Sequence, residues 1–308
     1  MTGARLSGEG RSATHQGPVR ALLEGLIDYA GLFPPAGLPM AEVVANFAAY
    51  QRRPDSWALG RLVVPAARLE EFEAALGALA DTERLGARWP ISALAGPDWT
   101  ADLTRVREFN ERHVHGGPQV LSLEGRTASA ADVQRFATAA GREFECYGEL
   151  PLGAELDSLV LLVRDAGIRA KIRAGGITAG DFPSPDQVLA FLKACATARV
   201  PFKATAGLHH LLRGPAPLTY APDSASATMF GYLNILLAAA VLWAGRPEDE
   251  ARRLLVATGS ADLELHGEKA IRYAGITVRL DEISQARREF ALAIGSCSFT
   301  EPLGEVYP

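Results

Sequence analysis

Short apolar runs alternate with longer segments of helical periodicity along most of the chain, from about Leu26 onward. Each short run favours extended backbone and is bounded by glycine, proline or polar residues, which is the pattern of a β-strand. Strands that alternate with helices favour a parallel sheet. We predict seven strands, at residues 26–30, 60–66, 90–96, 119–125, 144–151, 169–176 and 201–208.

The segments between these strands have the spacing of amphipathic helices. In one of them Val188, Leu189, Leu192 and Cys195 recur three and four positions apart, so that one helix face can pack on a sheet. Ser184 precedes a proline and an acidic residue there, as expected at the start of a helix. The predicted helices are residues 40–51, 68–79, 100–112, 130–140, 154–166 and 184–198.

The repeated strand–helix order predicts the fold. Seven such units in a chain of 308 residues favour a (β/α)8 TIM barrel, with a doubly wound open parallel sheet as the alternative. We expect a single barrel domain at residues 19–308 and a flexible tail at residues 1–18. The best candidates for an eighth strand are residues 261–267 and 270–278, followed by a charged helix at 280–294 and a C-terminal tail.

Polar residues recur on one face of the predicted strands. Alternate side chains of a barrel strand point inward, and active sites lie at the C-terminal strand ends. In "RAKIRAGG" this rule places Lys171 and Arg173 on one face, and in "PFKATAGL" it places Lys203 and Thr205 on one face. Uncompensated charges in a barrel interior would be costly, so the pattern predicts a ligand site. The other polar residues predicted to face inward are Asp28, Ser122, Glu124, Tyr147 and Glu149.

Cations on two adjacent strands indicate an anionic substrate, either a carboxylate or a phosphate. Arg173 could bind such a group with two hydrogen bonds, and Lys171 would add a point charge. Gly175 and Gly176 follow the strand with free backbone N–H groups, which could form a cradle for a phosphate.

Lys203 is the strongest candidate for chemistry. Burial and the nearby charges of Lys171 and Arg173 should lower the pKa of its amine. A neutral amine can attack a carbonyl to form a Schiff base, with Glu149, Tyr147 or Asp28 as proton carriers. The alternative is that Lys203 pairs with Glu149 in a structural ion pair.

The two lysine runs carry a family resemblance. "AKIRAGGIT", followed some thirty residues later by "PFKATAGL", resembles the strands of class I aldolases of the deoxyribose-phosphate aldolase type. The resemblance implies a TIM barrel in which Lys203 is the Schiff-base lysine and Lys171 is the lysine that opens the preceding strand motif. Ala204 and Ala206 depart from the aldolase pattern. The run from Lys203 onward also resembles the K-T-T-P-G-L-R run of quinolinate phosphoribosyltransferases, which implies a barrel for anionic substrates.

A histidine pair follows the last of these strands. The side chains of His209 and His210 should point apart on an extended segment, so that one faces the substrate and the other faces solvent. We expect no cofactor, although a divalent metal held by one of them with Glu124 and Glu149 is an alternative. Cys297 has no identifiable acid–base partner in the sequence and is interpreted as a structural thiol.

Composition narrows the class of protein. The formal net charge is −5 and the basic residues are scattered, which does not favour nucleic-acid binding. Three cysteines without a CxxC pair are typical of a reducing cytoplasm. The apolar run at 229–245 contains Asn234 and favours a buried helix over a membrane span. We therefore expect a cytoplasmic protein whose partner is a small anionic metabolite, and a homo-oligomer remains an open alternative.

Three functions fit these observations. The first is aldolase or lyase chemistry on a small anionic carbonyl metabolite through a Schiff base on Lys203. The second uses Lys171, Arg173 and Lys203 as a cationic clamp, for metal-assisted enolisation or phosphoribosyl transfer. The third is a barrel that binds an anionic ligand without catalysis, because the fold alone does not determine function.

Overall fold

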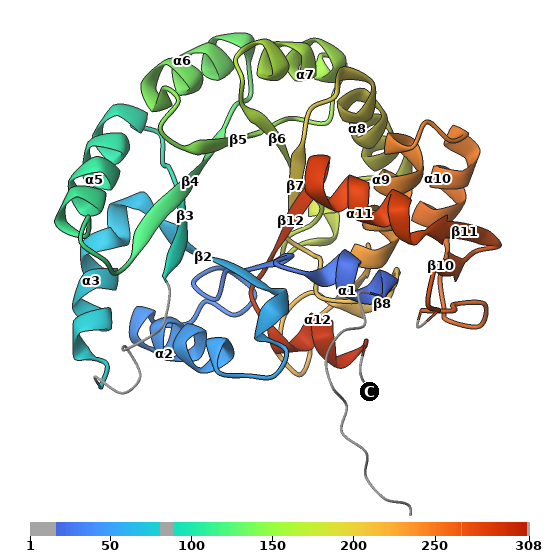
Figure 1. Ribbon diagram of the computed structural model, residues 1–308, viewed down its shortest axis with the longest axis horizontal. Coiled ribbons are helices and arrows are strands. Elements are labelled where there is room, and N and C mark those ends of the chain that lie inside the picture. The colour runs from blue at the N-terminus through green and yellow to red at the C-terminus, as the bar shows by residue number, and fades with distance from the viewer. Residues whose placement is uncertain (1–16, 81–88, 266, 307–308) are drawn as a thin grey trace, which may run out of the picture.

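The computed structural model describes residues 17–80, 89–265 and 267–306, and its centre is a closed barrel of parallel strands (Figure 1). The strand order around the barrel is β1-β12-β7-β6-β5-β4-β3-β2, and β1 pairs with both β12 and β2. This closure confirms the predicted TIM barrel and is incompatible with an open sheet. The barrel strands are β1 (Ile27–Tyr29), β2 (Leu59–Pro65), β3 (Pro90–Leu94), β4 (Gln119–Arg126), β5 (Glu145–Glu149), β6 (Arg169–Arg173), β7 (Phe202–Thr205) and β12 (Ala291–Ser296).

Helices surround the barrel, and two of them begin at serine caps. The Ser129 and Ser184 side chains each accept a hydrogen bond from a backbone N–H of the first helical turn, in α6 and α8. Pro18 opens α1, and residues 1–16 of the predicted tail lie outside the described residues. The helices are α1 (Pro18–Leu23), α2 (Met40–Gln51), α3 (Leu69–Ala78), α5 (Trp99–Arg112), α6 (Ala130–Ala140), α7 (Leu156–Asp165), α8 (Pro185–Ala198), α9 (Tyr232–Trp243), α10 (Glu248–Val256), α11 (Leu280–Glu289) and α12 (Thr300–Gly304).

The prediction of the eighth barrel strand was wrong. Residues 270–278 fall in an antiparallel hairpin outside the barrel, formed by β10 (Ala270–Tyr273) and β11 (Ile276–Arg279). The predicted helix at 280–294 ends at Glu289, and its last residues form β12, which closes the barrel between β7 and β1. The run "FALAI" is apolar throughout because both faces of the strand are covered, so it lacks the alternation that marks a half-exposed strand.

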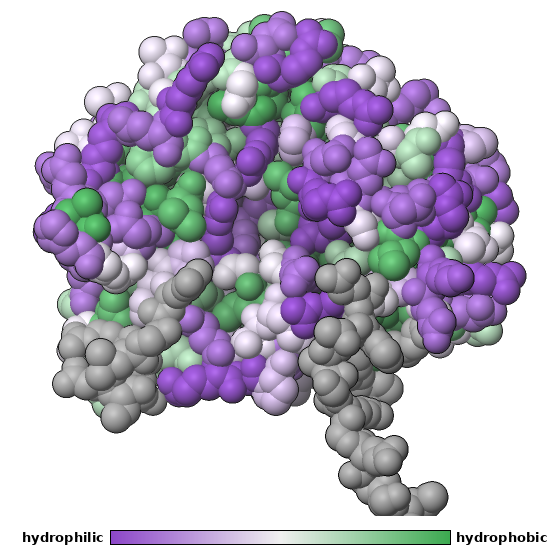
Figure 2. All heavy atoms as spheres, in the orientation of Figure 1, coloured by the Kyte–Doolittle hydropathy of each residue, from purple (hydrophilic) through white to green (hydrophobic). Residues whose placement is uncertain are grey.

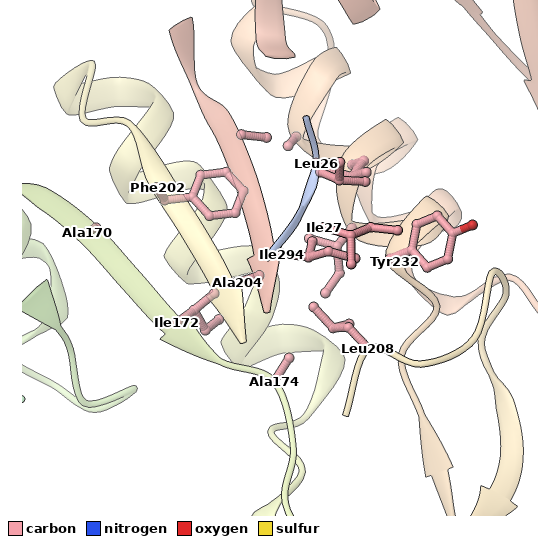
Figure 3. Packing of buried hydrophobic residues seen from close by; sticks show 14 of the residues in the cluster. Leu26, Ile27, Ala170, Ile172, Ala174, Phe202, Ala204, Leu208, Tyr232 and Ile294 are labelled. Atoms are coloured by element: carbon pink, nitrogen blue, oxygen red, sulfur yellow. The ribbon is translucent and has the colours of Figure 1, made fainter. Parts of the chain in front are cut away.

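The outward faces of the strands form the main hydrophobic core. Figure 3 shows Ile172, Phe202 and Ala204 together on this side of β6 and β7. The Phe202 ring meets the ring of Phe191 in α8 edge to face, with the ring centroids 5.6 Å apart. Because side chains alternate along a strand, this packing directs Lys203 to the barrel interior.

A second antiparallel hairpin follows β7. It is formed by β8 (Gly214–Pro217) and β9 (Ser226–Met229), and it has a small hydrophobic cluster of its own. Leu218 and Met229 belong to this cluster, and Phe182, from the loop after β6, packs against it. The hairpin is therefore anchored next to the C-terminal ends of β6 and β7.

The most apolar segment of the chain is the helix α9. Its residues are almost all buried, and Asn234 within it donates a hydrogen bond to the backbone oxygen of Leu254. The predicted buried helix is confirmed. Within the described ranges, no helix combines the length and the hydropathy that crossing a membrane requires.

Candidate functional site

Five charged side chains form one alternating chain inside the barrel. Asp28 Oδ2 lies 2.6 Å from Lys203 Nζ, and the same Nζ lies 2.5 Å from Glu124 Oε1. Glu124 Oε2 lies 2.8 Å from Lys171 Nζ, which lies 3.1 Å from Glu149 Oε2. Three carboxylates and two ammonium groups thus alternate in sign, and the isolated chain carries one excess negative charge.

Strand register brings these groups together. Lys171 and Lys203 are paired residues on the neighbouring strands β6 and β7, and Glu149 is paired with Lys171 across β5 and β6. The side chain of Glu124 is 2% exposed, and its Oε1 also accepts a hydrogen bond of 2.7 Å from Ser92 Oγ. The hydroxyl of Ser122 in turn donates to Ser92. Both oxygens of Glu124 therefore have fixed partners, which holds this carboxylate between the lysines.

The electrostatic environment contradicts the expected pKa of Lys203. Burial alone would lower the pKa of this amine, but the charges and hydrogen bonds of Asp28 and Glu124 raise it above its ordinary value. Burial likewise opposes ionisation of Glu124, yet Lys171 and Lys203 lower the pKa of this carboxyl. The prediction failed because it weighed the neighbouring cations and omitted the carboxylates between them. In the resting protein Lys203 is an ammonium.

Each lysine retains hydrogen-bonding capacity. An ammonium group has three N–H donors. Two carboxylates accept from Lys203 and two lie beside Lys171, while no further acceptor for either Nζ occurs in the described part of the chain. One donor on each lysine is therefore free for a ligand.

A cavity of about 130 Å³ lies above the charge chain, and both lysines and Glu124 line it. Phe33 and Pro34, from the loop after β1, form an apolar wall of this cavity. Figure 2 shows the opposite face of the molecule, at the N-terminal ends of the strands, where hydrophilic side chains cover much of the surface. The remaining polar lining residues are Arg173, Thr205, His209 and Cys297, which lie at or beyond the C-terminal ends of β6, β7 and β12.

Arg173 is the cation best placed to hold an anionic ligand. It is exposed at the end of β6 and lines the cavity. Among the residues that the structure describes, no carboxylate lies within ion-pair distance of its guanidinium, although its charge contributes to a lowered pKa of Asp181. Thr205 stands beside it on β7, with its hydroxyl 3.4 Å from the backbone oxygen of Ile172. Arg173 therefore keeps its donors for a ligand.

Gly175 and Gly176, the predicted glycine cradle after β6, pack closely against side chains of the following loop. A Cβ on Gly175 would lie 2.4 Å from the Phe182 ring, and one on Gly176 would lie 2.4 Å from Asp181 Oδ2. The carboxylate of Asp181 accepts a hydrogen bond of 2.8 Å from the backbone N–H of Thr178. These glycines therefore allow close packing of the loop that contains Phe182 and Asp181.

Tyr147 lies away from the cavity. Its hydroxyl accepts a hydrogen bond of 3.0 Å from Arg169, which also pairs with Glu145. Its ring centroid is 6.0 Å from Lys203 Nζ. Burial raises the pKa of this phenol above its ordinary value. Tyr147 therefore supports the lysine from a lower layer of the barrel, and the cavity lining does not include it.

His209 is at the centre of a second polar cluster, at the cavity mouth. Its Nδ1 lies 3.3 Å from Ser296 Oγ, 3.7 Å from Cys297 Sγ and 3.8 Å from Glu301 Oε2. Tyr220 joins the cluster by donating a 3.0 Å hydrogen bond to Glu301. Burial lowers the pKa of His209, with Glu301 opposing this effect, so the imidazole is neutral near pH 7. Cys297 thus has the acid–base neighbour that the sequence did not identify.

His210 has a different partner from His209. Its Nδ1 lies 2.7 Å from Glu305 Oε1, and this hydrogen bond raises the pKa of His210. No group of three His, Cys, Asp or Glu side chains within the described ranges has the arrangement of a metal site. Glu124 and Glu149, the two expected metal ligands, are both held by lysines instead.

Sequence reasoning missed four residues of the site: Ser92, Tyr220, Ser296 and Glu301. Ser92 could have been found, because it alternates with Ile91 and Ala93 in a predicted strand. The other three depend on the position of β12 and of the hairpin, which no local pattern indicated.

Comparisons of this chain with known protein families and with curated proteins found no match.

Proposed function

We propose that this protein is a carbon–carbon lyase of the aldolase type that acts on a small hydroxylated 2-oxo acid. The observation that carries the proposal is the pair of ammonium groups, Lys171 and Lys203, each with one N–H donor left for a ligand in the same cavity. Two fixed donors suit the carboxylate and the carbonyl oxygen of such an acid, because charge-assisted hydrogen bonds are strong and directional.

The substrate is held at its anionic end. In this proposal Arg173 and Lys171 bind the carboxylate, while Lys203 donates its free N–H to the neighbouring carbonyl oxygen. The buried carboxylates Asp28 and Glu124 fix the ammonium of Lys203 before substrate arrives. Preorganised donors of this kind stabilise charge that develops in the transition state.

Cleavage follows from proton transfer at the cavity mouth. Neutral His209 removes the proton of the substrate hydroxyl two carbons from the carbonyl, and the adjacent carbon–carbon bond breaks to release an aldehyde. The electron pair passes into an enolate whose oxygen accepts from Lys203. The imidazolium then returns its proton to the enolate carbon, so that the enzyme ends in its starting charge state and the second product is a 2-oxo acid.

A Schiff base on Lys203 is the second candidate, and it is the mechanism that the aldolase resemblance implies. Asp28 Oδ2 and Glu124 Oε1, at 2.6 and 2.5 Å, are close enough to take protons from the amine. The neutral amine would then attack the carbonyl, and the carbonyl oxygen would leave as water with those protons. The raised pKa of Lys203 favours the first mechanism, because the resting ammonium cannot attack.

Borohydride treatment separates the two mechanisms. The protein would be incubated with pyruvate and sodium borohydride and measured by intact-mass spectrometry. We expect pyruvate release from 4-hydroxy-2-oxo acids without a trapped adduct. An adduct on Lys203 would establish the covalent mechanism instead.

Matched variants test the proposal as a whole. Lys203→Met should abolish turnover of 4-hydroxy-2-oxo acids, whereas Lys193→Met, on the outer helix α8, should retain it. Turnover unchanged in Lys203→Met would refute both mechanisms. Tight binding of the acids without turnover in the wild type would indicate a binding protein.

We also place this enzyme in a reducing compartment, the cytoplasm. Cys146, Cys195 and Cys297 are all buried free thiols. Free thiols are retained where the surroundings are reducing.

A further inference from the structure

A second cavity adjoins the site described above. It has a volume of about 340 Å³ and lies under the connection between β8 and β9. His209 lines both cavities, and adjacent residues of one loop line them in turn, with Pro34 in the first and Pro35 in the second. The two cavities therefore share a wall at the imidazole that we propose as the base.

The walls of the second cavity are mostly apolar. Pro217, Leu218, Pro222 and Met229 contribute to its lining. Leu218 and Met229 are also buried in the hairpin's own hydrophobic cluster, which fixes their positions. Such a surface stabilises a ligand in proportion to the apolar area that it removes from water.

The two cavities differ in the charged groups that line them. Lys171, Lys203 and Arg173 line the first cavity, with one carboxylate between the lysines. The lining of the second cavity includes the carboxylate of Glu301. His210 also lines this cavity, but its Nδ1 lies 2.7 Å from Glu305 Oε1, so any positive charge on its ring is already paired. An anionic group would be repelled there, whereas it is attracted in the first cavity.

We propose that the second cavity binds an uncharged, apolar tail of the substrate whose 2-oxo acid head is held by the lysines. This inference rests on the proposed function and adds the substrate class. The substrate is then a monoanion with an extended tail, not a compound with an anionic group at each end. Tyr220, which contacts Cys297 at 3.6 Å and Glu301 at 3.0 Å, lies where head and tail would meet.

A series of straight-chain 2-oxo acids tests the wild-type protein without any variant. Affinities would be measured by calorimetry from pyruvate to 2-oxooctanoate, together with 2-oxoadipate. Once the chain enters the second cavity, each added methylene should strengthen binding about threefold to fourfold. 2-Oxoadipate should gain nothing over pyruvate, because its second carboxylate faces Glu301.

Variants test whether the gain in affinity for longer chains arises in the second cavity. Leu218→Trp fills the cavity, and the affinity ratio of 2-oxooctanoate to pyruvate should fall toward one. Ala221→Trp, at an exposed position of the same lining, provides the same test should the first variant unfold. Ala190→Trp, in an exposed groove lined by α7, α8 and α10, is the matched control and should keep the wild-type ratio. Glu301→Gln should improve binding of 2-oxoadipate relative to 2-oxooctanoate.

The outcomes are distinguishable. Pyruvate that binds without any gain for longer chains overturns this inference and leaves the proposed function standing. A gain that survives both tryptophan variants places the tail elsewhere and also overturns it. Failure of every acid in the series to bind contradicts the proposed function itself.

Discussion

Lys171 and Lys203 occupy paired positions on neighbouring strands, and their ammonium groups bind opposite oxygens of one carboxylate, that of Glu124. Each lysine also has a second carboxylate of its own, Glu149 or Asp28. The charges are thus held by one another in a largely buried region. This arrangement determines how the protein should respond to substitution and to pH.

Loss of Lys203 should cost stability as well as activity. Lys203→Met leaves Asp28 buried without its partner, and breaking a buried ion pair in this way typically costs about 3–5 kcal/mol. The double variant Lys203→Met/Asp28→Asn should recover much of that free energy of unfolding, measured by urea denaturation, yet remain inactive. Equal stabilities of the single variant and the wild type would show that the pair does not hold the fold.

The stability of the protein should depend on pH through Glu124. Its pKa is lowered below the ordinary value of 4.5, so its contribution is complete above that pH and is lost as pH falls through the folded-state value. The pKa of Lys203 is raised above 10.5, so its contribution is complete below that pH and is lost at higher pH. We therefore expect a plateau of melting temperature between about pH 4.5 and 10.5.

Glu124→Gln checks this assignment. The variant should melt lower than the wild type at pH 7 and should lose less stability between pH 4.5 and 2. Glu71→Gln removes a carboxylate from a surface pair with Arg68 and serves as the control, with little change at either pH. If the stability of Glu124→Gln falls as steeply below pH 4.5 as that of the wild type, other carboxyl groups take up the protons.

His209→Gln should lower kcat about 100-fold to 10,000-fold, the usual contribution of a general base. The base must be neutral, and burial lowers the pKa of His209 below 6.5, so wild-type activity should decline only below that pH. The acid limb of the pH–rate profile should disappear in the variant. His113→Gln, which disrupts a hydrogen bond to Glu73 at the end of α5, should keep the wild-type profile.

Arg173→Met should raise KM with a smaller effect on kcat, since it removes a binding contact to the carboxylate. Hydrogen bonds to charged groups contribute about 1.5–3 kcal/mol, so KM should rise about tenfold to a hundredfold. Arg252→Met, in a surface pair with Asp186, is the matched control. An unchanged KM in Arg173→Met would mean that the substrate carboxylate binds elsewhere.

Gly60→Ala should disturb the site from outside the cavity. A Cβ at this position would lie 2.3 Å from Asp28 Oδ1, whose carboxylate would have to move away from Lys203. We expect lower activity together with lower stability. Gly77→Ala, in α3, has no atom within 4 Å of the added Cβ and should be neutral or stabilising by about 0.5–1 kcal/mol. Equal activity in both variants would contradict a role for the position of Asp28.

Period-two alternation was sufficient to predict most of the charge chain. The outward packing of Phe202 and Ala204 required Lys203 to point inward, and the same reasoning placed Lys171. The protonation state of Lys203 was not predictable in this way, because it depends on how closely the carboxylates of Asp28 and Glu124 approach the lysine Nζ. Those distances follow from the register of the strands.

The eighth barrel strand, β12, could not be predicted from local sequence patterns. β12 has no polar alternation, and only Phe290 separates it from the end of α11, so the apolar run was read as the last turn of the helix. The prediction placed Ser296 and Cys297 in a C-terminal tail. It therefore gave no reason to expect them near His209. Tertiary pairing with β1 and β7 identifies this strand as part of the barrel.

The ion pair between Asp28 and Lys203 joins residues 175 positions apart in the chain, and β12 must lie between β1 and β7 before their strands form a closed ring. Chain closure over such a separation is slow compared with the formation of a neighbouring strand–helix unit. Asp28 and Lys203 would therefore meet only at the end of folding. In a partly folded chain, water would solvate the unpaired lysines and carboxylates. The complete set of ion pairs would form only when the ring of strands closes.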